Sequence, residues 1–398
     1  MSDAMLGVNH YESSYIPMKI QKLETFTSPY VSFVKVTTDD GMSGIGQMST
    51  YHADIIAQVF HRQVAPWVLG KSIAGAHHDQ DDGDARIVFA DLAARVTERE
   101  HKFPGSYIYR ALAGLDTALW DLVATAAEIP VTAMIGGKSG TLRAYASSMK
   151  RDISPADEAA RFCQLRDDKG FDAFKFRVGA ECGRGIDEWP GRTEEIIPTV
   201  TAALGDGIVK MVDANSCFGV ERAIEVGHML QDHGVTHYEE PCPYWHPDDT
   251  LQVTNALAID VTGGEQDCDM RVWKDMIDRR IVNIVQPDVM YMGGVTPWLQ
   301  VADMADKAGL ICTPHAANLS LVTICTMHVL QATPNAGPYL ELSIEGADYY
   351  PWQDGLFLGD PFKVTDGHVT ISDAPGWGVE VNPDWLATAD YAVSEVGG

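Results

Sequence analysis

Apolar residues near the start of the chain follow a strand-like pattern, and further on they recur at three- and four-residue intervals. Met18 to Thr27 and Tyr30 to Thr38 are predicted strands. Asp39-Asp40-Gly41 forms a hairpin turn, and a third strand starts at Gly44 to Met48. The helical spacing then predicts helices over Asp54 to Leu69, Ala85 to Arg95 and Tyr107 to Ala127. Residues 1–128 are therefore predicted to form an α+β capping domain.

From Leu142 onward, short apolar runs alternate with helical patterns such as Pro155 to Lys169 and Val220 to His233. This alternation is typical of a parallel (β/α) barrel. We predict an α/β fold over residues 129–355: a modified (β/α)8 TIM-type barrel, (β/α)7β in its order. Its eight strands are Arg143 to Ser148, Ala173 to Val178, Ile208 to Ala214, Thr236 to Glu240, Asp260 to Gly264, Ile281 to Pro287, Ile311 to His315 and Tyr339 to Leu342.

The last part of the chain, residues 356–398, is rich in loops. Phe362 to Val364 and His368 to Ile371 are short strand-like pieces within it. We expect this C-terminal segment to return and pack on the capping domain.

Composition supports a globular enzyme and narrows its partners. The 398 residues are 45% apolar, enough for a large core and a smaller domain. Lys and Arg total 29 against 56 Asp and Glu, a formal net charge of −27. Such a surface repels nucleic acid and anionic membranes, so neither is an expected partner. We expect a small-molecule ligand and a homo-oligomer.

The chain shows no sign of a membrane span or a secretory leader. No apolar run approaches the roughly 20 residues that cross a bilayer, and Met1 to Tyr15 lacks a basic segment followed by an apolar one. The seven cysteines are odd in number and contain no CxxC pair, as expected for reduced thiols. A cytoplasmic protein is predicted.

Six ionisable residues follow successive apolar runs at near-equal intervals. The steps between them are 26, 26, 23, 27 and 26 residues, close to the length of one strand, one helix and two loops. In a (β/α) barrel, such strand-end side chains converge on one mouth. They are Asp213, Glu239, Glu265, Asp288, His315 and Glu341.

The first three of these residues are candidate metal ligands. Asp213, Glu239 and Glu265 end three consecutive predicted strands and offer only hard oxygen donors. A carboxylate set without Cys or His favours Mg²⁺ over zinc. Three such residues in phase with the strand period predict a Mg²⁺ site.

The motifs that contain these residues resemble those of a known family. In order and approximate spacing, the chain is similar to the enolase superfamily, specifically its mandelate racemase subgroup. The resemblance covers nearly the whole chain, including the end of the cap. The matching motifs are Lys175-Phe176-Arg177, Asp213-Ala214-Asn215, Glu239-Glu240-Pro241, Gly264-Glu265, Pro287-Asp288 through Gly293-Gly294-Val295-Thr296, His315, Ala113-Gly114-Leu115-Asp116 through Trp120-Asp121, and Gly136-Gly137.

The resemblance implies a carboxylate substrate bound to Mg²⁺, a base that removes the proton beside that carboxylate, and an enediolate held by the metal. Asp213, Glu239 and Glu265 carry over as the metal ligands. His315 carries over as the base, with Asp288 as the partner that orients its imidazole and raises its basicity. Asp at position 288, where the muconate cycloisomerase-like subgroup has Lys, argues against that subgroup.

Lys175 and Arg177 lie two residues apart on one predicted strand and so share a face. The subgroup usually has Lys, a base, at the second position. Arg does not readily deprotonate, so this departure weakens a two-base mechanism. We assign Arg177 to anion binding and Lys175 to stabilising the substrate carboxylate or the enediolate, with a base role for Lys175 as the alternative.

Other contacts follow from the resemblance and from the expected cap loops. Glu341 matches the last-strand acid and is expected to hydrogen-bond the substrate carboxylate, as an acid or through water. Asn215, Tyr51, His52 and Ser147 (or its neighbour Ser148) are candidate substrate contacts.

One clear base favours one-sided proton abstraction followed by loss of a β-hydroxyl group. The leading hypothesis is a Mg²⁺-dependent acid-sugar dehydratase, a lyase that forms a 2-keto-3-deoxy acid. The alternative is a racemase, epimerase or sugar-lactone cycloisomerase that uses Lys175 as the opposing base. A non-enzymatic binding protein on the same fold would have lost the carboxylates and the dyad, and both are present.

Overall fold

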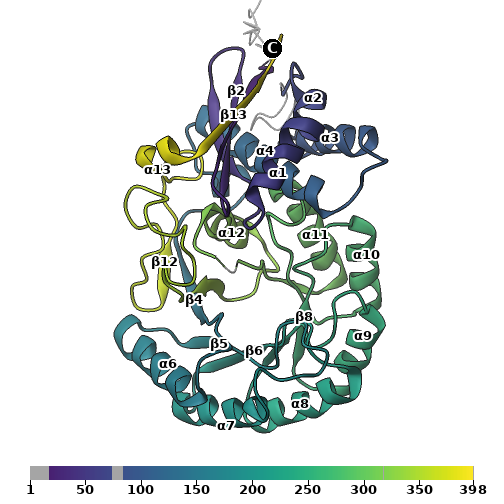
Figure 1. Cartoon of the computed structure of the whole chain (residues 1–398), viewed down its shortest axis with the longest axis vertical. Helices are drawn as coiled ribbons and strands as arrows, with labels where there is room; N and C mark the ends of the chain where they lie inside the picture. Colours follow the sequence, from purple (N-terminus) through teal and green to yellow (C-terminus); the bar gives the residue numbers. More distant parts are fainter. Residues whose placement is uncertain (1–17, 74–83, 317, 398) are drawn as a thin grey trace, which may run out of the picture.

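The capping domain is built on a four-stranded antiparallel sheet. The computed structural model describes residues 18–73, 84–316 and 318–397, and the leader region considered above lies outside these ranges. The sheet has the order β13-β1-β2-β3, so the last strand of the chain lies beside the first (Figure 1). The predicted hairpin joins β2 to β3. The strands are β1 (Ile20–Thr27), β2 (Ser32–Thr38), β3 (Ser43–Gln47) and β13 (Asp390–Glu395).

Helices pack on one side of this sheet, as the three- and four-residue spacing predicted. The first predicted helix is a continuous run of α1, a π-helical stretch and α2, and α4 makes the main contact with β3. Gly44 and Gly46 allow this contact, because a Cβ atom at either position would lie under 3 Å from the α4 backbone. The helices are α1 (Ala53–Val59), η1 (Phe60–Val64), α2 (Ala65–Val68), α3 (Ala85–Arg99), α4 (Ser106–Ala126) and the short connecting helix α5 (Val131–Met134).

The barrel has eight parallel strands and seven intervening helices within the described residues, the (β/α)7β order that was predicted. The helices form the outer layer (Figure 1). The strands are β4 (Thr141–Ser147), β5 (Ala173–Arg177), β6 (Val209–Asp213), β7 (His237–Glu239), β8 (Asp260–Gly263), β9 (Ile284–Val285), β10 (Ile311–Cys312) and β11 (Leu340–Ser343). The helices are α6 (Pro155–Lys169), α7 (Arg192–Leu204), α8 (Val220–Asp232), α9 (Pro247–Ala256), α10 (Met270–Arg279), α11 (Val295–Ala308) and α12 (Leu321–Ala332).

Strand β5 shows how the sequence orients side chains in the barrel. Phe174 packs against Phe162 of α6, with ring centroids 4.9 Å apart. Since successive side chains of a strand point to opposite faces, Lys175 and Arg177 point to the barrel interior. Arg177 pairs in register with Asp213 of β6, and Asp213 pairs with Glu239 of β7. The ladder therefore sets three predicted site residues side by side.

The C-terminal segment differs in part from its prediction. Phe362–Val364 forms no strand, because the Asp360 carboxylate accepts a hydrogen bond from the Phe362 N–H (3.1 Å) and holds the chain in a turn. The piece at His368 forms β12 (His368–Thr370), which pairs antiparallel with β4 of the barrel. After α13 (Pro383–Thr388), β13 crosses to the cap sheet. The boundaries 1–128, 129–355 and 356–398 stay a prediction.

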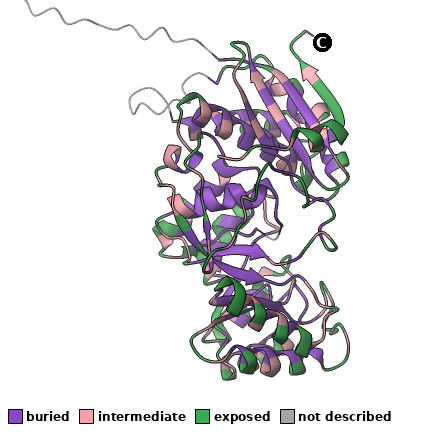
Figure 2. Cartoon of the chain, turned by 90° about the vertical axis from the view of Figure 1, so that its left-hand side faces the viewer, coloured by how far each residue is buried: buried purple, intermediate pink, exposed green. Residues whose placement is uncertain are grey.

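A continuous core connects the cap to the barrel (Figure 2). Asp116 of α4 is buried, and its Oδ1 accepts hydrogen bonds from the N–H groups of Val295 (2.6 Å) and Thr296 (3.2 Å) at the start of α11. The Asp116 carboxylate thus satisfies the free N–H groups of a barrel helix from within a cap helix. This contact helps to hold the cap over the barrel mouth.

All seven cysteines are free thiols. Among the described helices, none combines the length and the apolar character that crossing a bilayer requires.

A buried histidine of α12, in contact with the connecting helix α5, gives a testable pH dependence. His328 is 1% exposed, and its Nδ1 accepts a hydrogen bond from the Thr132 N–H (2.9 Å). Burial lowers the pKa of His328 from 6.5 to about 4. Because the folded state holds this proton less tightly than the unfolded state, the contribution of His328 to stability is complete above about pH 6.5 and is lost as the pH falls towards 4.

We expect His328→Asn to remove this pH dependence. Asn keeps an oxygen acceptor near the Nδ1 position and has no titrating ring. Between pH 7 and pH 4, the free energy of unfolding of the unmodified protein should fall by about 3 kcal/mol more than that of the variant. Urea denaturation at both pH values measures this difference. Equal losses in the two proteins would show that His328 is not responsible.

Candidate active site

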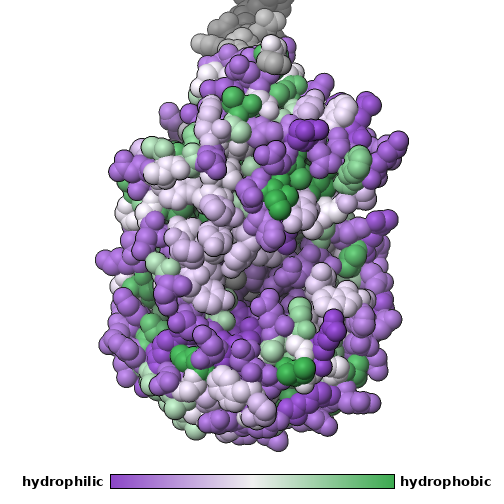
Figure 3. Space-filling model, viewed as in Figure 1, coloured by the Kyte–Doolittle hydropathy of each residue, from purple (hydrophilic) through white to green (hydrophobic). Residues whose placement is uncertain are grey.

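A cavity of about 400 Å³ lies at the carboxyl ends of the barrel strands, and Tyr51 of the cap contributes to its wall. Figure 3 shows a largely hydrophilic face, hollowed near its middle. Four predicted site residues from the barrel, Arg177, Asn215, Glu265 and His315, line this cavity. The full lining is Tyr51, Met149, Arg151, Arg177, Glu181, Asn215, Glu265, Gln266, Tyr291, His315, Tyr349 and Tyr350.

Lys175 lies below the cavity, fully buried among carboxylates. Its Nζ is 2.5 Å from Glu239 Oε2, 2.7 Å from Glu341 Oε1 and 4.0 Å from Asp213 Oδ2. Burial alone would lower the pKa of Lys175, but the charges of Glu239 and Glu341 outweigh burial and raise it above its ordinary value. Lys175 is therefore a fixed positive charge at neutral pH.

Arg177 joins two strand ends. Its guanidinium forms an ion pair with Asp213, and its Nη1 donates to Asn215 Oδ1 (2.9 Å). Its Nε donates to the carbonyl oxygen of Ser148 (2.7 Å) at the end of β4. Asn215 is tied to Asp213 in turn, since its N–H donates to Asp213 Oδ1 (2.7 Å). These bonds fix Arg177 beside the first predicted metal ligand.

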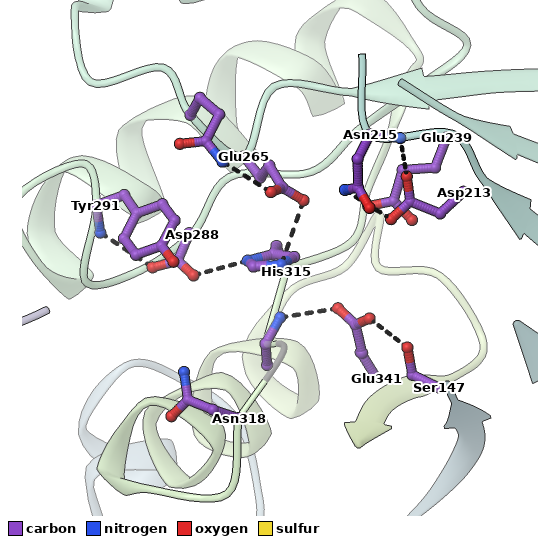
Figure 4. Close-up of polar contacts among 12 residues, drawn as sticks. Ser147, Asp213, Asn215, Glu239, Glu265, Asp288, Tyr291, His315, Asn318 and Glu341 are labelled. Carbon is purple, nitrogen blue, oxygen red and sulfur yellow. Dashed lines mark hydrogen bonds and ion pairs between the residues drawn. The ribbon is translucent and has the colours of Figure 1, made fainter. Parts of the chain in front are cut away.

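His315 and Asp288 form the expected hydrogen bond. His315 Nδ1 lies 2.8 Å from Asp288 Oδ2, and His315 Nε2 lies 3.2 Å from Glu265 Oε2 (Figure 4). Burial alone would lower the pKa of His315, but Glu265 and Asp288 outweigh burial and raise it to about 10. The N–H groups of Met290 (2.7 Å) and Tyr291 (3.0 Å) donate to Asp288 Oδ1, which orients the dyad.

Glu341 is held as a carboxylate. Burial alone would raise its pKa, but Lys175 and His315 lower it to about 2. Its Oε1 accepts from Ser147 Oγ (2.8 Å), and its Oε2 accepts from the Ala316 N–H (3.0 Å) (Figure 4). An ionised Glu341 has no proton to donate to a substrate carboxylate. Glu341 was predicted to contact that carboxylate either as an acid or through water, and its charge favours contact through water.

The predicted substrate contacts differ in position. Tyr51 and Asn215 line the cavity. Ser147 is buried and donates a hydrogen bond to Glu341. His52 is exposed at the start of α1, outside the cavity lining. The structure therefore brings two of the four to the cavity, and the roles of all four stay predictions.

Several lining residues were not predicted from the sequence. Arg151 lies in the loop between β4 and α6, Tyr291 in the loop after β9, and Tyr349 and Tyr350 in the loop after β11. These residues follow barrel strands, and the loops after the strands form the ligand site of a (β/α) barrel. Their position after a predicted strand was the feature of the sequence that could have identified them.

The acidic residues suit a hard cation by their chemistry. Glu239 Oε1 and Glu240 Oε1 are buried oxygens that accept no hydrogen bond, and the buried Glu265 Oε2 has only its ion pair with His315. Such oxygens at neighbouring strand ends fit Mg²⁺, which prefers oxygen ligands. In the part of the chain that the structure describes, no three His, Cys, Asp or Glu side chains are arranged as a ready metal site. Asp213, Glu239 and Glu265 instead pair with Arg177, Lys175 and His315.

Comparison with known proteins shows the family. Residues 6–136 match the N-terminal domain of the mandelate racemase and muconate lactonizing enzyme family, and residues 157–385 match the enolase C-terminal domain-like family. The chain therefore belongs to the enolase superfamily, in its mandelate racemase subgroup. The fold and the subgroup inferred from the sequence motifs are confirmed.

Solved structures share this fold. A Roseobacter denitrificans protein, provisionally named a racemase, is 60% identical with a TM-score of 0.91, and the match covers 95% of this chain and 100% of that one. A mandelate racemase/muconate lactonizing protein from Paracoccus denitrificans, complexed with magnesium, is 28% identical with a TM-score of 0.83, over 96% and 99% of the two chains.

Curated relatives differ in their reactions. Arabinonate dehydratase from Saccharolobus solfataricus is 25% identical over 352 residues, 87% of each chain. D-galactarolactone cycloisomerase from Agrobacterium fabrum is 30% identical over 365 residues, 89% of each chain. These relatives support acid-sugar dehydration or related enolase-superfamily chemistry.

Proposed function

We propose that this protein is a Mg²⁺-dependent acid-sugar dehydratase. The observation that carries the proposal is the His315–Asp288 pair on one side of a cavity that also contains Arg177, a residue that cannot act as a second base. The buried cation Lys175 lies below. A single base beside fixed positive charges suits one-sided removal of an α-proton.

Asp213, Glu239 and Glu265 would hold the metal ion. Bound Mg²⁺ would supply concentrated positive charge beside the substrate carboxylate, where negative charge develops when the α-proton leaves. The magnesium in the Paracoccus denitrificans structure supports Mg²⁺ as the ion.

The protein side chains then account for the proton movements. His315 Nε2 takes the proton from the carbon next to the carboxylate, and Asp288 stabilises the resulting imidazolium. Lys175 stabilises the negative charge on the substrate oxygens. The C–O bond at the β-carbon breaks, and the leaving hydroxide accepts the His315 proton and departs as water. The enol product tautomerises to a 2-keto-3-deoxy acid.

The basicity of His315 depends on its neighbours. In this structure Glu265 and Asp288 hold the pKa of His315 at about 10, so the ring carries a proton at neutral pH. A base must be unprotonated, so its pKa has to lie closer to the working pH. Glu265 is a predicted metal ligand, and once its charge is neutralised His315 loses one of the two contacts that favour its cationic form.

A racemase, epimerase or sugar-lactone cycloisomerase is the second candidate. The 60% identical Roseobacter denitrificans protein and the Agrobacterium fabrum cycloisomerase support it. Racemisation requires an opposing base, for which Lys175 is the predicted alternative. Glu341, which is not a predicted metal ligand, pairs with Lys175 and stabilises its charged form, and this favours the dehydratase.

A screen of aldonic and aldaric acids with Mg²⁺ tests the proposal. We expect at least one acid to yield a 2-keto acid, detected as its semicarbazone, with turnover that stops when EDTA is added. Recovery of an epimer or an opened lactone without 2-keto acid would favour the second candidate. The cytoplasmic location and the homo-oligomer stay predictions, and light scattering on purified protein tests the second.

A further inference from the structure

Arg151 is a cavity-lining cation without an acidic partner. Its Nε donates to the Gly179 carbonyl oxygen (3.0 Å), and its Nη2 donates to Asn215 Oδ1 (2.6 Å). Both acceptors are neutral. Among the described residues no carboxylate oxygen lies within 4.0 Å of the guanidinium, although the chain carries a net charge of −27. The Nη1 group forms no hydrogen bond to a described residue.

The other cations of the site are already neutralised, which sets Arg151 apart. Lys175 pairs with Glu239 and Glu341, Arg177 with Asp213, and His315 with Asp288 and Glu265. Asn215 Oδ1 accepts from Arg151 and Arg177 together, so the two guanidinium groups share one neutral acceptor. An anion at Arg151 would offset a positive charge that the protein itself leaves unpaired.

Arg151 lies nearer the solvent than Arg177 and Lys175 do. Lys175 is fully buried and Arg177 is 4% exposed, whereas Arg151 is only partly buried and Tyr51 beside the cavity mouth is 44% exposed. A sugar acid with its reacting carboxylate near Lys175 would therefore extend its far end towards Arg151. The planar guanidinium fork matches a carboxylate in shape as well as in charge.

We infer that Arg151 binds a second, terminal anionic group, and that the substrate is an acid sugar with a carboxylate at each end, an aldaric acid. This inference rests on the proposed function for the orientation of the ligand. Glu181 and Tyr349 also line this part of the cavity. Glu181 is exposed, so solvent screens its charge more strongly than the charge of the partly buried Arg151.

Burial supports the assignment. Burial, and then the nearby charge of Arg177, lower the pKa of Arg151 to about 10, which leaves it cationic at neutral pH. A charge that is partly desolvated and unpaired gains more from an anionic ligand than a surface arginine does.

The test compares matched acids for binding and turnover in the full chain with Mg²⁺. The probes are D-glucarate with D-gluconate, galactarate with D-galactonate, and 6-phosphogluconate as the phosphate-bearing arm. We expect the unmodified protein to bind at least one aldarate about 100-fold more tightly than its aldonate, measured by calorimetry. Arg151→Gln should remove this preference while aldonate affinity changes less than about threefold.

Arg184→Gln is the matched control. Arg184 is exposed in the loop that follows β5, lies outside the cavity lining, and carries the same charge. Arg184→Gln should keep the aldarate preference, because we attribute that preference to Arg151 and not to the general positive charge near the cavity mouth. Arg151→Lys should keep part of the preference, since the charge remains but the fork does not.

Three results would overturn the inference. In the first, the unmodified protein binds aldarates and aldonates with equal affinity. In the second, Arg151→Gln loses affinity for aldarates and aldonates to the same extent. In the third, the unmodified protein binds 6-phosphogluconate more tightly than every aldarate. The second result would make Arg151 a positioning residue for Asn215. Failure of the proposed function is a separate outcome, because calorimetry can show aldarate preference at Arg151 even if no 2-keto acid forms.

Discussion

Glu239→Gln is expected to abolish Mg²⁺ binding at the site and to reduce turnover by at least about 10³-fold. Glu239 is the central one of the three strand-end carboxylates, and its Oε1 is a buried oxygen without a hydrogen-bond partner. Removing a residue that only hydrogen-bonds to a metal ligand weakens metal binding by about 10–100-fold. Removing a metal ligand itself should weaken binding more than that. Calorimetric titration with Mg²⁺ and circular dichroism measure binding and fold.

Glu341→Gln is the matched control for this prediction. Both glutamates are fully buried and both pair with Lys175, so each substitution removes one of its two close carboxylates. Lys175 keeps one partner in either variant, which limits the loss of stability. Only Glu239 is a predicted ligand, so Glu341→Gln should retain Mg²⁺ binding. Equal weakening in the two variants would remove Glu239 from the ligand set.

His315→Asn is expected to lower kcat by at least about 10⁴-fold. Loss of a general base typically costs about 10²–10⁴-fold, and the α-proton of a carboxylate is so weakly acidic that water is a poor substitute. Asn can still donate a hydrogen bond towards Asp288, so the fold should remain. Lys175→Ala should also lower kcat, through lost stabilisation of the intermediate. Steady-state kinetics on an acid from the screen measures both effects.

His228→Asn serves as the control for His315→Asn. His228 is exposed on α8, on the outer layer of the barrel. Its replacement should leave kcat unchanged. A His315→Asn variant within about tenfold of the unmodified protein would remove His315 from the role of base.

The fold could be predicted because local pattern and barrel geometry agree. In β5, the alternation of Phe174 and Phe176 with Lys175 and Arg177 identifies both the strand and its two faces. The strands β9 and β10 end earlier than predicted, because Pro287 and Pro314 follow them and have no N–H to donate to a ladder. The strand predicted at Phe362–Val364 was wrong, since a polar turn at Asp360 outweighed its apolar composition.

The barrel residues of the site were predictable because strand register fixes them. Arg177, Asp213 and Glu239 lie on adjacent strands at paired positions, so a strand-end pattern is enough to place them together. The order of the strands along the chain also places Asp288 beside His315.

Loop residues could not be placed in this way. Arg151 is held by Gly179 and Asn215, which belong to two other loops. Tyr51 and His52 are neighbours in the sequence, yet only Tyr51 lines the cavity, where it packs against Trp352 with ring centroids 5.5 Å apart. Contacts between segments this far apart in the chain leave no local pattern.

The central claim is that His315 is the only base, and exchange of the substrate α-proton in deuterated water tests it most directly. The His315→Asn variant, in which Lys175 is intact, is incubated in deuterated water with Mg²⁺ and an acid that the unmodified protein turns over. Proton NMR then follows the α-proton signal of that acid. We predict no exchange above the rate without enzyme, because Glu341, which is not a predicted metal ligand, stabilises the protonated form of Lys175. Sustained exchange in this variant would contradict the account and identify Lys175 as a base.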